Sequence, residues 1–246
     1  MAFGIQLYND SGSVLLDDLY VNMQLSTKLT INSMTPYQYS MATGAEVAGD
    51  YADLNKIYFL VDAPVYSSPI VAVTSPTGRA IAPDYVMDPA YGNTPAGYKR
   101  FGFSCDGTTA ATITAYVYDK INPATLTSTG FGVEFRNPSN EIIYHFTKPV
   151  LKPTNLITLR GNNVVTTTTV SSAKSYAFIF CNPTQGSYLA ASTSQRPIMS
   201  CGLEITNSTT ISQKGVNDST TFPLYGSGAK QELSISQAFI VEVTYS

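Results

Sequence analysis

Apolar and polar residues alternate at period two in several segments of this chain, and this pattern predicts short β-strands separated by turns. Two strand-like segments, alternating or rich in branched residues, are residues 111–118, Ala-Thr-Ile-Thr-Ala-Tyr-Val-Tyr, and residues 238–245, Ala-Phe-Ile-Val-Glu-Val-Thr-Tyr. Clusters of Pro, Gly, Asn and Ser separate such segments. Helical candidates are short, as in residues 44–54, and the many Thr and Val residues favour strands. The pattern therefore predicts an all-β fold of antiparallel sandwiches.

The chain also contains an internal repeat. A gapless alignment of residues 3–16 with residues 131–144 places identical Phe, Gly, Asn and Ser residues in register and sets apolar positions against apolar positions. Each copy predicts a β-hairpin, and the turn residues are those that tolerate a positive φ or cap a bend with a side chain. The turns are Asn9-Asp-Ser-Gly12 and Asn137-Pro-Ser-Asn140.

Weaker matches continue this repeat in the same order. Residues 56–64 resemble residues 174–183, and both are interpreted as central strands ended by proline. Residues 111–118 and 238–245 then close the two halves. A period of roughly 120–130 residues indicates duplication of a whole domain, because solenoid and propeller repeats have periods of about 20–50 residues. The prediction is two tandem duplicated antiparallel β-sandwich-like domains, residues 1–122 and 130–246, joined by a linker at residues 123–129.

The stretch from Thr74 to Gly97 is rich in Pro, Gly and Tyr and has little periodicity, so it is predicted to be a long loop. Loops of this length in compact domains are usually functional or mobile. Tyr85, Tyr91 and Tyr98 are candidate interaction residues, because a rigid amphipathic ring offers a large contact area at small entropic cost. The alternative is that these tyrosines fill the edge of the core with their hydroxyls in water.

Composition and charge exclude several classes of protein. Charged residues make up 13% of the chain, hydrophobic residues 43%, and the net charge is −3, which argues against disorder. The 14 basic residues are spread thinly against 17 acidic ones, so nucleic-acid binding is not expected. No apolar run or signal-peptide pattern predicts membrane insertion or export. Cys105, Cys181 and Cys201 are expected to be buried small side chains of a chain made in a reducing cytoplasm.

Candidate catalytic residues are few. The single histidine, His145, lies in a strand-like run without a triad or metal motif, so a structural or surface role is expected. Paired carboxylates could serve glycoside hydrolysis, although acidic pairs are typical of turns in any soluble protein. The pairs are Asp17 with Asp18, Asp50 with Asp53, and Asp84 with Asp88. No calcium-loop or phosphate-loop motif is present, and the sequence predicts no catalytic residue, no cofactor and no metal site.

The repeated hairpin resembles the start of small tail-associated proteins of tailed bacteriophages. In those proteins a Gly-hydrophobic-x-hydrophobic-Tyr/Phe-Asn-x-x-Gly hairpin follows the initiator Met, as do Phe3-Gly-Ile-Gln-Leu-Tyr-Asn-Asp-Ser-Gly12 and Val14-Leu-Leu-Asp17 here. The resemblance covers some 15–20 residues at each of two places, and the second copy departs from it at Arg136, Pro138 and Asn140. It implies a non-enzymatic structural component of a virion, in the tail tip, baseplate or fibre apparatus, assembled in the host cytoplasm.

The expected partners are other virion proteins, further copies of the chain in a homo-oligomer, and a host cell-surface receptor or glycan. Three alternatives remain open. A head decoration protein would use the same kind of surface, a carbohydrate-binding or adhesin-like module would use the tyrosine-rich loop as a stacking platform, and a glycan-cleaving enzyme would need one of the carboxylate pairs.

Overall fold

The computed structural model describes residues 6–8, 14–17, 22–33, 56–75, 78–87, 94–107, 109–126, 133–160, 166–181, 185–188, 198–216, 230–232 and 235–244. Strands of the first half are β1 (Gln6–Tyr8), β2 (Val14–Asp17), β3 (Gln24–Asn32), β4 (Lys56–Pro64), β5 (Ile70–Thr74), β6 (Ala80–Met87), β7 (Tyr98–Asp106) and β8 (Thr112–Asp119). A short 3-10 helix, η1 (Pro123–Thr125), follows. Strands of the second half are β9 (Glu134–Arg136), β10 (Ile142–His145), β11 (Pro153–Arg160), β12 (Thr167–Thr169), β13 (Tyr176–Phe180), β14 (Gln185–Tyr188), β15 (Ile198–Asn207), β16 (Thr210–Val216), β17 (Lys230–Glu232) and β18 (Ile235–Glu242).

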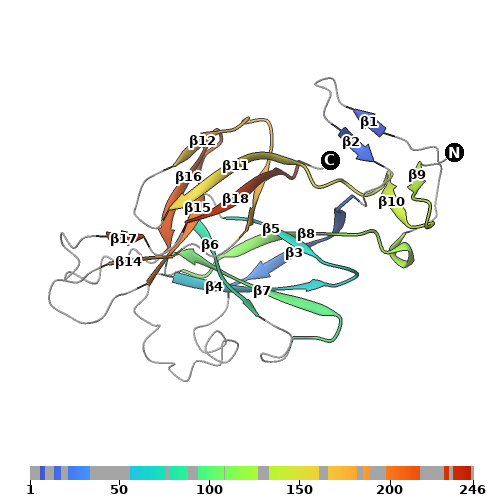
Figure 1. The fold of residues 1–246 in the computed structure, drawn as a ribbon. Coiled ribbons are helices and arrows are strands. Elements are labelled where there is room, and N and C mark those ends of the chain that lie inside the picture. Colours follow the sequence, from blue (N-terminus) through green and yellow to red (C-terminus); the bar gives the residue numbers. More distant parts are fainter. Residues whose placement is uncertain are drawn as a thin grey trace.

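The strands form two large antiparallel sheets and two small hairpins (Figure 1). Sheet I has the order β11-β18-β13-β5-β8-β3, and sheet II has the order β12-β16-β15-β6-β7-β4, with β14 and β17 joined to β15. The hairpins β1–β2 and β9–β10 lie on the same side of the molecule, at the right in Figure 1. The prediction of an all-β, sandwich-like fold is confirmed.

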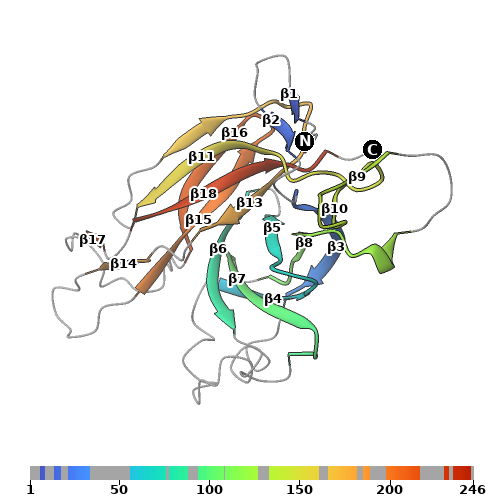
Figure 2. The ribbon, with the colours of Figure 1, turned by 45° about the vertical axis from the view of Figure 1, so that its right-hand side comes forward.

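Both sheets run through both halves of the chain. In sheet I the halves meet where Val73 of β5 pairs with Phe178 of β13. In sheet II they meet where Ile81 of β6 pairs with Leu203 of β15. Figures 1 and 2 show the first half, blue to green, continuing into the second half, yellow to red, across these seams. The two halves therefore share their sheets, a feature that the sequence pattern did not indicate.

A large hydrophobic core lies between the sheets, and its described residues come from both halves. Its fully buried members include Phe59 and Ile81 from the first half and Phe178, Leu203 and Ile240 from the second. The outer face of sheet I carries a second cluster of buried residues, among them Ala72, Tyr116 and Val241, beneath Met23 and Leu151. Strands β5 and β13, at the seam of sheet I, thus have both faces largely covered, which explains why their sequences, Ile-Val-Ala-Val-Thr and Tyr-Ala-Phe-Ile-Phe, are nearly continuous apolar runs.

The two halves contribute equivalent strands to each sheet. When the strands of each half are followed from the outer edge of a sheet to the seam, they come in the same order. Strands β3, β8 and β5 of sheet I answer to β11, β18 and β13, while β4, β7 and β6 of sheet II answer to β12, β16 and β15. The two outer ladders of sheet I each contain one residue without a paired partner, which shifts the register. This residue is Ser26 in β3, opposite β8, and Thr154 in β11, opposite β18. The alignment that pairs Phe3 with Phe131 also pairs Ser26 with Thr154.

The repeated segments both form the hairpins that the sequence predicts. The residue pairs Leu7–Leu16 and Tyr8–Val14 in hairpin β1–β2 answer to Phe135–Tyr144 and Arg136–Ile142 in hairpin β9–β10, with the same register shift between them. Asn140, which the alignment sets against Gly12, adopts a φ of +63° in the second turn. Duplication of a whole domain, with its boundary at residues 123–129, stays a prediction. The equivalent strand orders and the shared register shifts of the two halves support it.

Three expectations from the sequence are wrong. Residues 56–64 and 174–183 are not equivalent, because β4 forms an edge of sheet II whereas β13 lies at the seam of sheet I. The stretch from Thr74 to Gly97 is not one loop, because it contains β6, whose alternation is obscured by Pro83 and a register shift beside it. Cys105 and Cys201 are buried as expected, but Cys181 is exposed. The helical candidate at residues 44–54 lies outside the described residues.

Candidate functional site

Of the three candidate tyrosines, Tyr98 alone has a side chain within the described part of the structure. Tyr98 begins β7 and is 40% exposed. Tyr85 lies in β6, but its side chain is outside the described part of the structure, as is all of Tyr91. The Val65 amide, just after β4, donates a hydrogen bond at 2.8 Å to the carbonyl of Gly97, just before β7. This bond places Tyr98 beside the turn that follows β4.

That turn, residues 65–69 between β4 and β5, carries the most exposed described tyrosine. Tyr66 is 51% exposed and Val65 is 41% exposed. We name residues 65–69 the Tyr66 turn. The sequence carried the signal that could have located it, an aromatic residue between Pro64 and Pro69 in polar surroundings, which is the same signal that marked the other tyrosines.

The carboxylate of Asp119, at the end of β8, holds the backbone of the Tyr66 turn. Its Oδ2 accepts hydrogen bonds from the amides of Tyr66 at 2.9 Å and Ser67 at 3.0 Å. Its Oδ1 accepts from the amides of Ser68 at 3.0 Å and Lys120 at 2.7 Å. Asp119 is only 1% exposed, and these four N–H dipoles compensate the burial of its charge. The turn is consequently fixed in position while the Tyr66 side chain projects into solvent.

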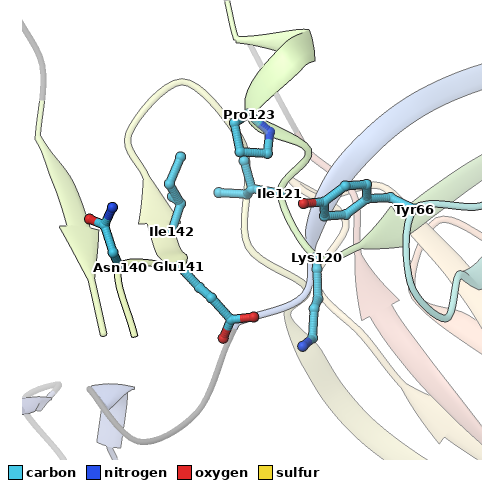
Figure 3. Close-up of a pocket in the computed structure, with 7 residues that line it drawn as sticks. All are labelled: Tyr66, Lys120, Ile121, Pro123, Asn140, Glu141 and Ile142. Atoms are coloured by element: carbon cyan, nitrogen blue, oxygen red, sulfur yellow. The ribbon is translucent and has the colours of Figure 1, made fainter. Parts of the chain in front are cut away.

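A cavity of about 190 Å³ lies beside Tyr66. Figure 3 shows Tyr66 and Lys120 on one side of it, and Asn140, Glu141 and Ile142 from hairpin β9–β10 on the other. Ile121 and Pro123, at the start of the connection between the two halves, complete the lining. The cavity is therefore built from three segments that are distant in sequence, and no local motif could have indicated it.

Hairpin β9–β10 is fixed to the first half by the side chain of Gln24, which is 1% exposed. The His145 amide donates to Gln24 Oε1 at 2.8 Å, and Gln24 Nε2 donates to the carbonyls of His145, at 2.9 Å, and Lys148. Asn22 Nδ2 donates to the Ile143 carbonyl at 3.2 Å. With its base held in this way, the hairpin presents its tip to the Tyr66 turn.

The cavity wall combines polar and apolar groups. Ile121 and Ile142 are 7% and 4% exposed and provide an apolar floor. Glu141 Oε2 accepts a hydrogen bond from Asn137 Nδ2 at 2.8 Å, which leaves Oε1 available. Within the described part of the chain, the Tyr66 hydroxyl and the Lys120 ammonium have no hydrogen-bond or ion-pair partner. Such an arrangement can bind a small ligand through a ring face, two donors and a carboxylate acceptor.

The other candidate residues do not extend this site. His145 lies outside the cavity, and its Nδ1 is 2.7 Å from Thr147 Oγ1. All six aspartates of the carboxylate pairs fall where the structure describes no side chain. Among the residues described, no three His, Cys, Asp or Glu side chains lie close enough to hold a metal ion. No helix in the described ranges has the length and apolar character of a membrane span.

Comparisons with known proteins add nothing to this picture. No family model, no curated protein and no solved structure matches the chain.

Proposed function

We propose that the chain is a non-enzymatic structural component of a bacteriophage virion and that it belongs to the tail tip, baseplate or fibre apparatus. It acts through contacts with other virion proteins and further copies of itself, and it contributes to attachment to the host surface. The proposal starts from the resemblance of the two hairpins to phage tail-associated proteins.

One observation carries the proposal that the chain works through protein interfaces. Leu156 of β11 pairs directly with Phe239 of β18 on the outer face of sheet I, and these side chains are 51% and 38% exposed. Elsewhere on this face, residues such as Tyr116 and Val241 are buried. Neighbouring large apolar side chains left in solvent on an ordered sheet are typical of a surface that a partner covers.

Purified particles of the phage whose genome encodes the chain provide the test. Quantitative mass spectrometry should find the chain at a stoichiometric copy number, in the tail fraction once heads and tails are separated. Recovery with the heads would support a decoration protein instead, and absence from both fractions would contradict a virion role.

A matched pair of variants tests the surface itself. Leu156→Asp should reduce incorporation into particles at least tenfold, because a charge would be buried at the interface. Thr206→Asp, an exposed position on β15 of sheet II, introduces the same residue on the other sheet and should incorporate normally.

The second candidate is a carbohydrate-binding module. The cavity beside the Tyr66 turn favours it, since an aromatic ring can contact the C–H face of a sugar while polar groups around the ring bind the sugar hydroxyls. The tyrosine loop expected from the sequence contributes only Tyr98 to the described surface near this turn.

A further inference from the structure

We infer that the cavity between the Tyr66 turn and the tip of hairpin β9–β10 binds one uncharged sugar ring, a neutral hexose or N-acetylhexosamine residue of a surface glycan. The inference rests on the attachment role proposed for the chain. It names the ligand class and the residues, and it places the site at Tyr66, which lines the cavity.

The size of the cavity limits the ligand to a single ring. Its volume is about 190 Å³. Pockets for drug-sized ligands measure roughly 300–1,000 Å³, so a peptide segment or a nucleotide would not be enclosed here. A six-membered ring with its substituents fits this volume and can continue into solvent past Tyr66, Asn140 and Glu141, which are exposed.

The chemistry of the walls matches a sugar. A pyranose has C–H groups on its faces and hydroxyls around its edge. The Tyr66 ring and the buried side chains of Ile121 and Ile142 offer apolar contact to a C–H face. The Tyr66 hydroxyl and Lys120 ammonium supply donors, and Glu141 Oε1 supplies an acceptor for a sugar hydroxyl.

The charges of the cavity favour an uncharged ligand. Lys120 contributes one positive charge and Glu141 one negative charge from opposite walls, as Figure 3 shows. A phosphate or carboxylate that approaches Lys120 also approaches the Glu141 carboxylate, and the attraction and repulsion offset each other. A neutral polyol can hydrogen-bond to both groups without this conflict.

The two walls are held in place before any ligand arrives. Asp119 fixes the Tyr66 turn through four amides, and Gln24 fixes the base of hairpin β9–β10. Because the backbone of both walls is already ordered, binding has to order only the side chains that contact the ligand, which lowers the conformational entropy lost on binding. A single ring still binds weakly, and several copies of the chain in one particle would raise the effective affinity through avidity.

Saturation-transfer NMR on the full chain tests the inference. The probes are glucose, galactose, mannose, N-acetylglucosamine and N-acetylgalactosamine, with glucuronate as a charged counterpart. Inorganic phosphate, tested as a competitor, covers a free anion. At least one neutral sugar should give a saturable signal, strongest on the protons of one ring face, and glucuronate and phosphate should bind more weakly.

Three variants locate the site. Tyr66→Ala should reduce the signal at least fivefold, because it removes the ring without touching the backbone bonds to Asp119. Phe146→Ala, at an aromatic position of similar exposure that follows β10 and does not line the cavity, should leave the signal unchanged. Tyr98→Ala tests the tyrosine loop that the sequence favoured. Thermal unfolding of each variant confirms that the fold is retained.

Several outcomes would overturn the inference. These are the absence of any signal from neutral sugars, an unchanged signal in Tyr66→Ala, loss of the signal in Tyr98→Ala alone, or stronger binding of glucuronate or phosphate. The particle experiment separates the two proposals. A chain that is present in particles but binds no sugar overturns only the saccharide site, and a chain that binds sugar through Tyr66 but is absent from particles overturns only the virion role.

Discussion

Asp119 is a buried side chain that determines the conformation of an exposed turn. It is buried at the end of β8, yet its four hydrogen bonds from the amides of residues 66, 67, 68 and 120 define the exposed Tyr66 turn. In the sequence this residue is only an aspartate before a lysine at the end of a strand. Its importance follows from burial, because a carboxylate out of water must find several donors.

Gly202 is the residue on which the seam of sheet II depends most directly. A Cβ at this position would lie 2.3 Å from the carbonyl oxygen of Ile81 and 2.6 Å from its carbon. Both atoms belong to the backbone of β6, the neighbouring strand from the other half, so neither can rotate away. The close approach of the two halves requires a residue without a side chain.

We predict that Gly202→Ala destabilises the protein by about 1–3 kcal/mol, the usual cost of overpacking a filled site. Urea unfolding followed by circular dichroism would measure the change. Thr206→Ala, at an exposed position of the same strand, should change the free energy of unfolding by less than about 0.5 kcal/mol. Equal stability of Gly202→Ala and the parent chain would mean that the two strands do not approach as the structure shows.

Among the elements, the strands of the second half are joined by a charged cluster as well as by their ladder. Glu242 at the end of β18 is 7% exposed and forms ion pairs with Lys174, at 2.6 Å, and Lys152, at 3.2 Å. The hydrogen bond from Lys174 lowers the pKa of Glu242, burial acts in the opposite direction, and Lys152 adds to the lowering. The cluster ties β18 to the segments that precede β13 and β11.

We predict that this cluster makes the stability of the protein depend on pH in the acid range. The folded-state pKa of Glu242 lies below that of an unfolded chain, so its contribution is complete above about pH 4.3 and is lost as the pH falls through the lower folded value. Because both lysines are largely exposed, solvent screens the pairs and the expected effect of Glu242→Gln at pH 7 is modest, a Tm lower by about 2–4 °C.

The measurement is the Tm of both proteins between pH 7 and pH 2.5. The difference between Glu242→Gln and the parent should shrink as the pH falls. Glu134→Gln serves as the control, since the ion pair of Glu134 with Arg136 lies on the exposed hairpin β9–β10, and it should leave the profile unchanged. A difference that stays constant with pH would assign the loss in Glu242→Gln to packing and not to charge.

At the scale of the whole molecule, the halves that the repeat predicts as separate domains share two sheets and one core. Each half contributes three adjacent strands to sheet I and three to the main path of sheet II. If the halves were separated, β5 and β6 of the first half and β13 and β15 of the second half would become unpaired edge strands. Those strands are rich in buried apolar residues, and such exposed edges associate with other strands.

We predict that residues 1–122 and 130–246, produced separately, are insoluble or associate with themselves, and that they form a one-to-one complex when co-expressed. Co-purification through a tag on one half, followed by size-exclusion chromatography with light scattering, would measure this. Gly202→Ala in the second half should weaken the complex, which ties the association to the seam. If each half is a soluble, folded monomer, the shared sheets are not needed for folding and the halves are independent domains.

Much of the strand content could be predicted from the sequence, because its causes are local. The alternation in residues 111–118 depends on neighbours in the chain, and it corresponds to β8. The turn of hairpin β9–β10 could be predicted for the same reason, since Asn140 can adopt the positive φ that the turn needs. Local cues failed at β6, where Pro83 and a register shift interrupt the period.

The candidate site could not be predicted, because it depends on contacts between distant segments. Tyr66 and Glu141 are brought to one cavity only by the path of β8 and the docking of hairpin β9–β10. The tyrosines chosen from composition share a residue type and a polar neighbourhood with Tyr66, but composition does not reveal which ring lies beside a hollow in the surface. Lys120 likewise lines the cavity together with the Tyr66 turn, which lies about 50 residues earlier in the chain.

By itself, the sequence determined that this is an all-β protein and that two aligned segments fold into hairpins of one register, because period-two patterning and turn residues act over a few positions. Only the tertiary structure decided that the two halves share their sheets, that Gly202 must be glycine, and that Tyr66 faces a cavity. Those features arise where strands from different halves pack together, and the free energy that selects such a pairing comes from burial of the combined core, which no single segment encodes.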